Sequence, residues 1–150
     1  MRVSDLCNHE VVTIAPGASI AAAAKLMRDR HVGDVLVVER RPSGQVPIGI
    51  LTDRDLVVGV LAQNIHALDT IRVEDAMNRQ LVTIAADADL GAALHVMRTS
   101  GVRRLPVINN LEVLVGILAY DDLVHWLAEE LADFSSLFTV QSHQERIRRV

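Results

Sequence analysis

The sequence predicts a mixed α/β protein built from two copies of one β-α-β-β-α unit. The first observation is a repeat: residues 12–15, Val-Thr-Ile-Ala, recur as residues 82–85, seventy positions later. The second is the alternation, in each half, of a helical apolar stripe with short apolar strands. The third is composition: of 150 residues, 50% are hydrophobic and 23% are charged, which is the balance of a globular protein.

Each copy opens with a short β-branched segment, residues 11–15 or 81–85, which predicts a strand. A helix follows, with Ser19 or Asp89 expected as its N-cap. Gly101 is expected to end the second of these helices. The apolar residues of the two helices share the spacing i, i+3, i+4 and i+7. They are Ile20, Ala23, Ala24 and Met27 in the first copy, and Leu90, Ala93, Leu94 and Met97 in the second.

Two more strands and a second helix complete each copy. The strands are expected at residues 35–38, 48–51, 105–108 and 115–118. The helix starts near Thr52 in the first copy and near Ala119 in the second. Apolar strands flanked by helices predict an α/β sheet covered by helices on one face. Because one unit of about 60 residues is marginally stable alone, we expect the two sheets to pack together with approximate two-fold symmetry and two clefts.

By chain position we expect one unit in residues 1–68, a second in 69–130, and a helical or disordered tail in 131–150. The tail departs from the repeat and is a candidate docking element for a partner or a second copy. Near it, an apolar stripe at helical spacing consists of Leu123, Trp126, Leu127 and Leu131. The stripe is either part of the core or an exposed face that pairs two copies, since tryptophan is enriched in interfaces.

Charge and composition exclude several classes of function. A net charge of −4 and an aromatic content of 3% disfavour a nucleic-acid partner. The single cysteine, Cys7, excludes an internal disulfide, and the six histidines lack metal-ligand spacing, so we expect no metal. No nucleophile motif or phosphate loop occurs, so we expect no enzyme. No apolar run is long enough to cross a bilayer and no signal core follows Met1, so we expect a cytoplasmic protein without a membrane partner.

At the expected junction of strand and helix, Thr52 and Asp55 have the spacing of a capping box. In that interpretation the two side chains only satisfy free N–H groups of the first helical turn. The same geometry suits a nucleotide, because a helix N-terminus attracts phosphate and a carboxylate there accepts hydrogen bonds from ribose hydroxyls. These residues alone leave both interpretations open.

The repeated unit, residues 48–56 and residues 97–107 together resemble the CBS domain family, named after cystathionine β-synthase. The resemblance covers residues 2–128, in two copies, and is that of a stand-alone prokaryotic CBS-domain protein. It implies a tandem CBS module with no required cofactor, whose clefts bind an adenosine-containing ligand: AMP, ADP, ATP or S-adenosylmethionine. It also implies a flat homodimer that acts as a regulatory sensor for an unidentified partner protein. The alternative is a ligand-independent dimerisation or scaffold protein.

The resemblance implies two sites. The positions that contact ribose and phosphate are Thr52, Arg54, Asp55, Arg103, Arg104 and Asp122. The positions that line the base pocket are Thr13, Ile14, Val35, Val37, Thr83, Ile84 and Pro106. The first site groups Thr52 and Asp55 with walls from the first copy, and a phosphate there needs Arg54 or an arginine of the other repeat. The second groups Asp122, Arg103 and Arg104 with walls from the second copy. Ala119 takes the place of Thr52 there, so we expect one good site and one weak or empty site.

Overall fold

The computed structural model describes residues 1–63, 66 and 68–148, with side chains described as far as residue 136. The first half contains α1 (Val3–Leu6), β1 (Thr13–Ile14), α2 (Ile20–Arg30), β2 (Asp34–Arg41), β3 (Gly44–Thr52) and the π-helix η1 (Asp55–Leu61). The second half contains α3 (Val73–Ala76), β4 (Ile84–Ala85), α4 (Leu90–Ser100), β5 (Arg104–Ile108), β6 (Leu114–Ala119) and α5 (Tyr120–Arg148). Both halves follow the predicted order β-α-β-β-α, each preceded by a short helix that was not predicted.

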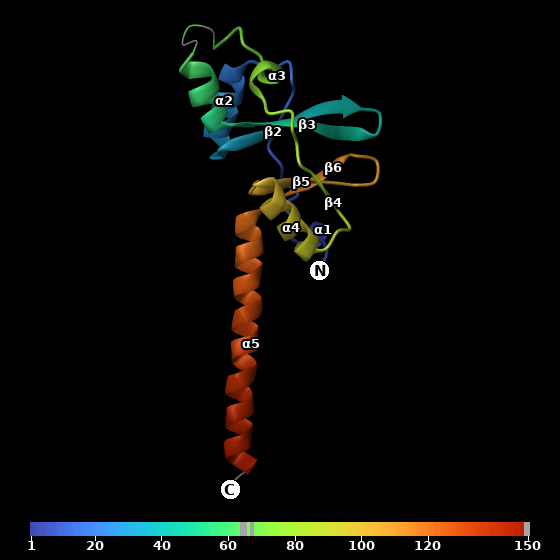
Figure 1. The fold of residues 1–150 in the computed structure, drawn as a ribbon, viewed down its shortest axis with the longest axis vertical. Helices are drawn as coiled ribbons and strands as arrows, with labels where there is room; N and C mark the ends of the chain where they lie inside the picture. The colour runs from blue at the N-terminus through green and yellow to red at the C-terminus, as the bar shows by residue number, and fades with distance from the viewer. Residues whose placement is uncertain (64–65, 67, 149–150) are drawn as a thin grey trace.

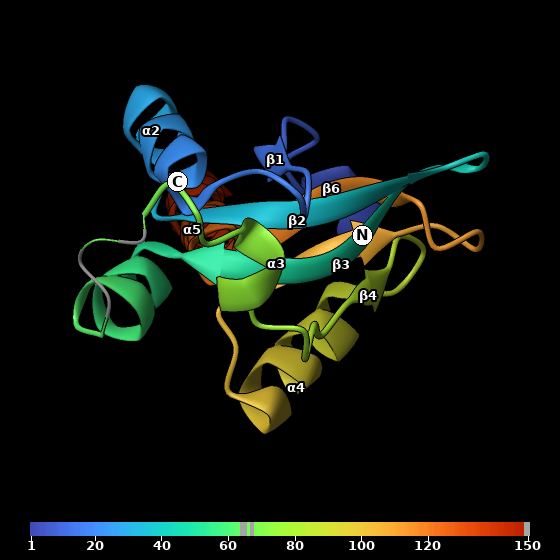
Figure 2. The same ribbon diagram turned by 90° about the horizontal axis from the view of Figure 1, so that it is seen from above.

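Each half forms a three-stranded mixed sheet. In the first, β1 runs parallel to β2, and β2 runs antiparallel to β3. The strands β4, β5 and β6 repeat this order and these directions. The sheets meet where β3 contacts β6, and the two hairpins extend to the same side of the molecule (Figure 1). The helices α2 and α4 lie on the outer sides of the paired sheets (Figure 2). The prediction of two packed α/β repeats is confirmed.

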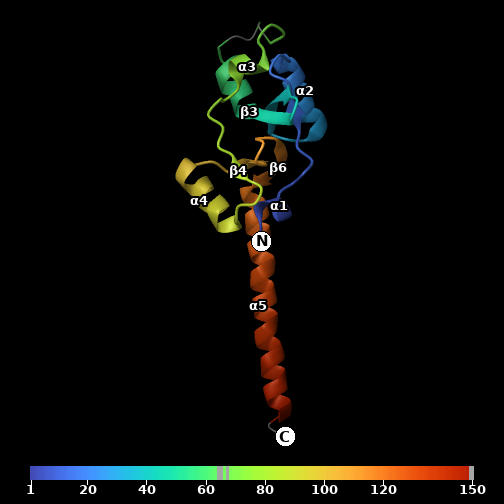
Figure 3. The ribbon, with the colours of Figure 1, turned by 90° about the vertical axis from the view of Figure 1, so that its right-hand side faces the viewer.

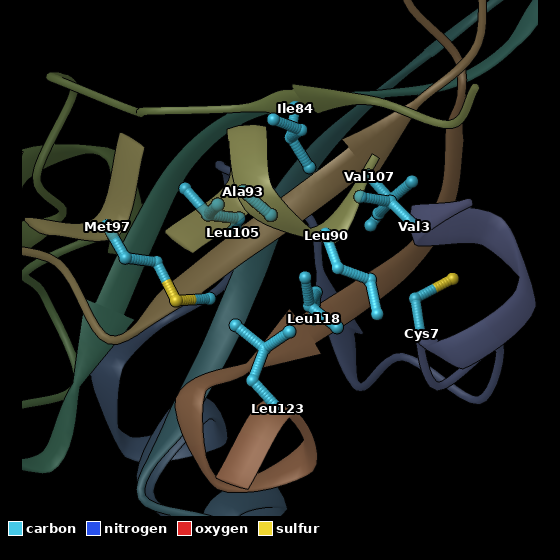
Figure 4. Close-up of a cluster of buried hydrophobic side chains, with 10 residues drawn as sticks. All are labelled: Val3, Cys7, Ile84, Leu90, Ala93, Met97, Leu105, Val107, Leu118 and Leu123. Atoms are coloured by element: carbon cyan, nitrogen blue, oxygen red, sulfur yellow. The ribbon is translucent and has the colours of Figure 1, made fainter. Parts of the chain in front are cut away.

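The two halves exchange their short first helices. Helix α1 begins the chain but packs on the second sheet, where Val3 and Cys7 belong to a buried cluster that otherwise consists of second-half side chains (Figure 4). Helix α3 begins the second half but packs on the first sheet, where Val73 and Met77 join the other buried cluster. Each hydrophobic core is therefore completed by the opposite half of the chain.

Backbone hydrogen bonds anchor both exchanged segments. Asn8 and Ile117 exchange two bonds of 2.9 Å, so the chain after α1 runs beside β6. Asn78 and Ile50 exchange bonds of 2.8 and 3.1 Å, so the chain after α3 runs beside β3. Each core contains residues from before and after residue 68, so the predicted boundary there separates the two sequence repeats but not the two cores. The division into units 1–68, 69–130 and 131–150 stays a prediction.

A glycine in each sheet makes room for the exchanged segment. A Cβ added at Gly116 would lie 2.6 Å from the Cys7 sulfur and 2.8 Å from the carbonyl oxygen of Asn8. A Cβ added at Gly49 would lie 2.6 Å from the Met77 sulfur. Both distances are shorter than van der Waals contact, so the repeated Gly-Ile-Leu of the two copies reflects the close approach of a second backbone.

Local capping explains where the longer helices begin and end. The Ser19 hydroxyl accepts a 3.1 Å hydrogen bond from the N–H three residues on, and the Asp89 carboxylate accepts an equivalent bond of 2.7 Å. Both predicted N-caps are confirmed. Gly101 ends α4 in the left-handed region with φ 66°, as predicted. At the equivalent place in the first half, His31 adopts φ 54°, which is uncommon for a residue with a side chain.

The second post-strand helix, α5, leaves the body of the molecule as one long rod (Figure 3). The stripe predicted on it divides in two. Leu123 is buried in the second core and Trp126 packs against that core, whereas the other two members, Leu127 and Leu131, are exposed to solvent. Two further exposed residues of α5, Val124 and Phe134, extend this exposed part; the four residues Val124, Leu127, Leu131 and Phe134 are called the α5 stripe below. Throughout the described residues, no helix combines the length and the apolar character that crossing a bilayer requires.

Candidate functional site

Two cavities lie between the repeats. The first, called the Thr52 cleft, has a volume of about 250 Å³ and joins Thr52, at the end of β3, to residues 80–82 and to the start of β5. The second, called the Asp122 cleft, has a volume of about 270 Å³ and joins Asp122, in α5, to residues 10–12 and to the start of β2. Residues 80–82 and 10–12, seventy positions apart, thus take equivalent places in the two clefts, and so do Thr52 and Ala119 at the aligned strand–helix junctions, as two-fold pseudo-symmetry requires.

Each cleft combines the strand–helix junction of one repeat with the middle strand of the other. Thr52 shares its cleft with Arg103, Arg104 and Pro106 from the second repeat. This grouping differs from the predicted one, which joined Thr52 to first-copy walls and placed Arg103 and Arg104 with Asp122; Arg103 lines the Thr52 cleft and not the Asp122 cleft. The difference arises because the sheets face each other, so the end of β3 meets the opposite β5. The arginine of the other repeat, one of the two predicted alternatives, is the one that lines the cleft with Thr52.

Arg54 and Asp55 lie on a different face of the junction. Both line an outer cavity of about 570 Å³ that runs along η1 to residues 71–76. The lining of the Thr52 cleft includes neither of them. Asp55 remains linked to that cleft through its hydrogen bonds with Thr52, whereas Arg54 belongs to the outer cavity. A role for either residue toward a ligand stays a prediction.

The face of the middle strand that lines the cleft is opposite to the predicted face. Val35 and Val37 are fully buried in the first core, beneath α2. Because side chains alternate along a strand, Leu36 between them lines the Asp122 cleft. Pro106, seventy residues on, lines the Thr52 cleft in the same way. The placement of Val35 and Val37 on a cleft is therefore corrected to Leu36, and the repeat offset from Pro106 was the signal that could have found it.

The residues near the short first strands that line the clefts also differ from the predicted ones, by one position along the chain. Thr13, Ile14, Thr83 and Ile84 lie on β1 and β4, and Ile84 is buried in the second core. The linings of the two clefts contain none of these four. The preceding residues, Val12 and Val82, line the Asp122 and Thr52 clefts instead. Alternation along an extended segment again places neighbouring side chains on opposite sides.

The capping box predicted at Thr52 is present. The Thr52 N–H donates to Asp55 Oδ2 at 2.9 Å, and the Asp55 N–H donates to Thr52 Oγ1 at 3.1 Å. In the second repeat, only half of this arrangement remains: the Ala119 N–H donates to Asp122 Oδ2 at 2.9 Å. The structural interpretation of Thr52 and Asp55 therefore holds, and it leaves the Thr52 side chain on the wall of a cleft, where the ligand interpretation needs it.

An ion pair lies between the clefts. Asp34 and Arg104 occupy equivalent positions, seventy residues apart, and form a salt bridge across the pseudo-two-fold axis. The Asp34 side chain is only 12% exposed, while that of Arg104 is 45% exposed. Both residues line both clefts. Beside them, the Arg103 guanidinium lies over the Tyr120 ring, 5.6 Å from its centroid.

The chemistry available in the clefts is that of binding. In the Thr52 cleft, guanidinium groups and a hydroxyl supply hydrogen-bond donors suited to an anion, and Val82, Val102 and Pro106 supply apolar walls suited to a flat ring. Within the part of the chain that the structure describes, no group of three His, Cys, Asp or Glu residues could hold a metal ion.

Two sequence comparisons and one structural comparison identify the family. The sequence model of the CBS domain matches residues 3–61 and 73–129. The CBS domain-containing protein YhcV of Bacillus subtilis is 35% identical over 143 residues, which cover 95% of this chain and 96% of YhcV. An uncharacterized protein of Methanopyrus kandleri, MK0525, is 30% identical over 124 residues, which cover 83% of this chain and 61% of MK0525. The chain thus matches less than two thirds of that relative's length.

A solved structure shares the fold. The CBS domain pair of protein MJ0100, in complex with 5′-methylthioadenosine and S-adenosyl-L-methionine, superimposes with a TM-score of 0.73. Sequence identity to it is 23%, and the match covers 87% of this chain and 98% of that one. Three observations agree on the family: two tandem matches to its sequence model, a relative of almost equal length, and the same paired-sheet architecture. The chain belongs to the CBS domain family, as a CBS domain pair, a regulatory ligand-binding module.

Proposed function

We propose that this CBS pair senses an adenosine-containing ligand, AMP, ADP, ATP or S-adenosylmethionine, and signals to a partner protein through a change in packing or assembly. The observation that carries the proposal is the construction of the clefts: each has one wall from each repeat. The adenosine ligands of the MJ0100 pair support the choice of ligand class. The proposal places the protein in the cytoplasm, where such metabolites are found.

The mechanism follows from the two-sided walls. A ligand in the Thr52 cleft contacts the end of β3 and the start of β5, so it is held by both repeats at once. Its binding energy then depends on how the two sheets are placed relative to each other. A ligand that fits one placement better shifts the population toward it, by no more than the difference between its affinities for the two placements. A partner that touches both repeats would detect that shift.

A second copy of the chain is the first partner that we propose. The α5 stripe has spacings of three, four and three residues, the alternation of three and four that marks the apolar seam of a two-helix coiled coil. Two α5 helices can pair with the α5 stripe of one copy against that of the other, as in a coiled coil. The α5 stripe would then be buried between two copies, which gives a homodimer.

Sedimentation analysis tests this dimer. The wild type should sediment as a dimer at micromolar concentration, and Leu127→Glu with Leu131→Glu should give a folded monomer. Glu129→Gln, on the same helix but outside the α5 stripe, should remain dimeric. A wild-type protein that stays monomeric at a concentration of 100 μM or so would remove the homodimer from the proposal.

Thermal shift against AMP, ADP, ATP and S-adenosylmethionine tests the sensor. A ligand at about 100 times its Kd stabilises the folded state by about 2.7 kcal/mol, which raises the Tm of a domain of this size by roughly 5–10 °C. Thr52→Ala should reduce the ligand-induced rise. Ser19→Ala removes a comparable N-cap outside both cleft linings, so it should lower the basal Tm and leave the ligand-induced rise unchanged. A folded dimer with no response to any of the four ligands would favour the scaffold alternative.

A further inference from the structure

The two clefts differ in charge at equivalent positions. Two pairs of residues seventy positions apart line one cleft each and differ in formal charge, and in both pairs the residue on the Thr52 cleft is the more positive. These pairs are Gln80 and Glu10, and Arg103 and Gly33. The equivalent residues Arg104 and Asp34 line both clefts, so they add the same charges to each.

The formal charges of the linings show the result. The Thr52 cleft is lined by two arginines and one aspartate, which give +1. The Asp122 cleft is lined by three carboxylates, Glu10, Asp34 and Asp122, and by Arg104, which give −2 with His31 neutral. Counting Asp55 with the Thr52 cleft, because it is bonded to Thr52, still leaves the two clefts two charges apart.

The cations of the Thr52 cleft are presented in a way that suits phosphate. Arg103 is held with one face of its guanidinium over Tyr120, so its in-plane N–H groups are free of that contact and can bind phosphate oxygens in pairs. Thr52 adds a hydroxyl on the same wall. In the Asp122 cleft, Gly33 stands where Arg103 would be and Ala119 where Thr52 would be, so both donors are replaced by groups that cannot bind an anion.

The shared ion pair couples the two clefts. Arg104 and the nearly buried Asp34 carboxylate line both clefts, so their charges cancel in each, and the difference between the clefts comes from Arg103, Glu10 and Asp122. A phosphate in the Thr52 cleft that attracts Arg104 draws it away from Asp34. That carboxylate then adds its full charge to the Asp122 cleft, so occupation of one cleft by an anion favours a cation in the other.

We infer that the two clefts select adenosine ligands of different charge: the Thr52 cleft binds a phosphorylated, anionic adenosine, and the Asp122 cleft binds an adenosine whose 5′ group is uncharged or cationic, such as a thioether or a sulfonium. The inference rests on the proposed adenosine-sensing function and adds to it the ligand class of each cleft. It assigns Arg103 and Glu10 as the residues that decide between the classes.

Isothermal titration calorimetry with four probes tests the inference: AMP and ADP as anions, 5′-methylthioadenosine as the uncharged ligand, and S-adenosylmethionine as the sulfonium. Arg103→Gly copies the residue of the other cleft and should weaken AMP and ADP at least tenfold, with the other two ligands changed less than threefold. Glu10→Gln copies Gln80 and should weaken S-adenosylmethionine about three- to tenfold, with 5′-methylthioadenosine and AMP unchanged. With AMP saturating, S-adenosylmethionine should still bind, once per chain and more tightly than without AMP.

Each contrary outcome is distinct. Binding of AMP that is insensitive to Arg103→Gly, or displacement of AMP by S-adenosylmethionine at a single site, overturns the charge assignment and leaves the adenosine sensor standing. Absence of binding by all four probes to folded wild-type protein overturns the proposed function and the inference together. Circular dichroism and the Tm of each variant establish that it is folded, and Arg98→Ala, an arginine on α4 outside both cleft linings, is the matched control for loss of a surface arginine.

Discussion

The two repeats agree where they are packed and differ where they face the clefts. In both cores the same kinds of residues occupy the same places: Leu51 and Leu118 are fully buried, and Gly49 and Gly116 both face an exchanged segment. At the clefts, equivalent positions carry different charges, as the pair of Asp34 and Arg104 shows. Close packing leaves little freedom to change a side chain, whereas a position on a cavity wall can change its charge without loss of the fold.

The helices that follow the two junctions also differ. In the first repeat, the helix after Thr52 is η1, a π-helix that ends at Leu61. In the second, α5 continues as far as Arg148 and carries the α5 stripe away from the body (Figure 1). The same junction thus supports a short helix that borders a cavity and a long helix that presents an apolar face. The repeat defines the cleft, and the divergent helices define what each half can contact.

The largest expected effect tests the equivalence of the cores. Leu51→Ala and Leu118→Ala each delete a fully buried side chain in corresponding strands. Each should destabilise the protein by about 2–5 kcal/mol, through lost burial and the cavity that remains, and the two losses should agree within about 1 kcal/mol. Urea denaturation measures both. A large loss for one variant and little loss for the other would show that the two cores do not contribute equally to folding.

The next effect distinguishes the two exchanged segments. Gly116→Ala places a methyl group against the Cys7 sulfur and the Asn8 backbone, and should cost about 1–3 kcal/mol. Gly49→Ala meets the flexible end of Met77 and a backbone oxygen that is slightly farther away, so it should cost less. Denaturation midpoints of the two variants give the comparison. Equal losses would indicate that the backbone contact, rather than the sulfur-bearing side chain, sets the cost.

A smaller effect concerns the capping boxes. Thr52→Ala removes the hydroxyl that accepts from the Asp55 N–H and gives the first repeat the arrangement of the second. It should cost about 1 kcal/mol, as other N-cap substitutions do. The reverse change, Ala119→Thr, should stabilise the protein by up to about 1 kcal/mol. Thermal unfolding without ligand measures both, and destabilisation by Ala119→Thr would mean that the second junction has no room for the hydroxyl.

The smallest effect is a dependence on pH in the second core alone. Burial raises the pKa of the Cys7 thiol above its ordinary value of 9.0. A backbone hydrogen bond opposes this rise in part, and the carboxylates of Asp122 and Asp5 add smaller increases to the pKa. The folded state therefore holds the thiol proton more tightly than the unfolded state does. The stability that this contributes is complete below the unfolded pKa and is lost as the pH rises through the folded pKa.

The comparison of wild type with Cys7→Ala isolates this contribution. Between pH 7 and pH 10, the free energy of unfolding of the wild type should fall by about 1 kcal/mol or less beyond any fall in the variant. The equivalent position in the first core is Met77, which does not titrate, so Met77→Ala should leave the pH dependence as it is in the wild type. A steeper fall in Cys7→Ala than in the wild type would contradict the assigned direction of the pKa shift.

Features set by neighbouring residues were predictable from the sequence. The repeat, the N-caps at Ser19 and Asp89, the left-handed end at Gly101 and the capping box at Thr52 each depend on residues within a few positions of one another. Their hydrogen bonds form wherever the surrounding chain is placed, so spacing alone identifies them. The resemblance to the CBS domain family was likewise carried by local segments, and the family comparison confirms it.

Features set by the meeting of distant segments were decided by the tertiary structure. Residues 3–8 complete the second core rather than the first, and Thr52 faces Arg103 and Arg104 rather than the walls of its own copy. The face of β2 that lines a cleft is that of Leu36, because the opposite face is covered by α2. The sequence by itself determined the repeating unit and its local caps, since short-range hydrogen bonds and periodicity do so. Only the packing of two sheets across a pseudo-two-fold axis decided which side chains share a cleft and what charge it carries.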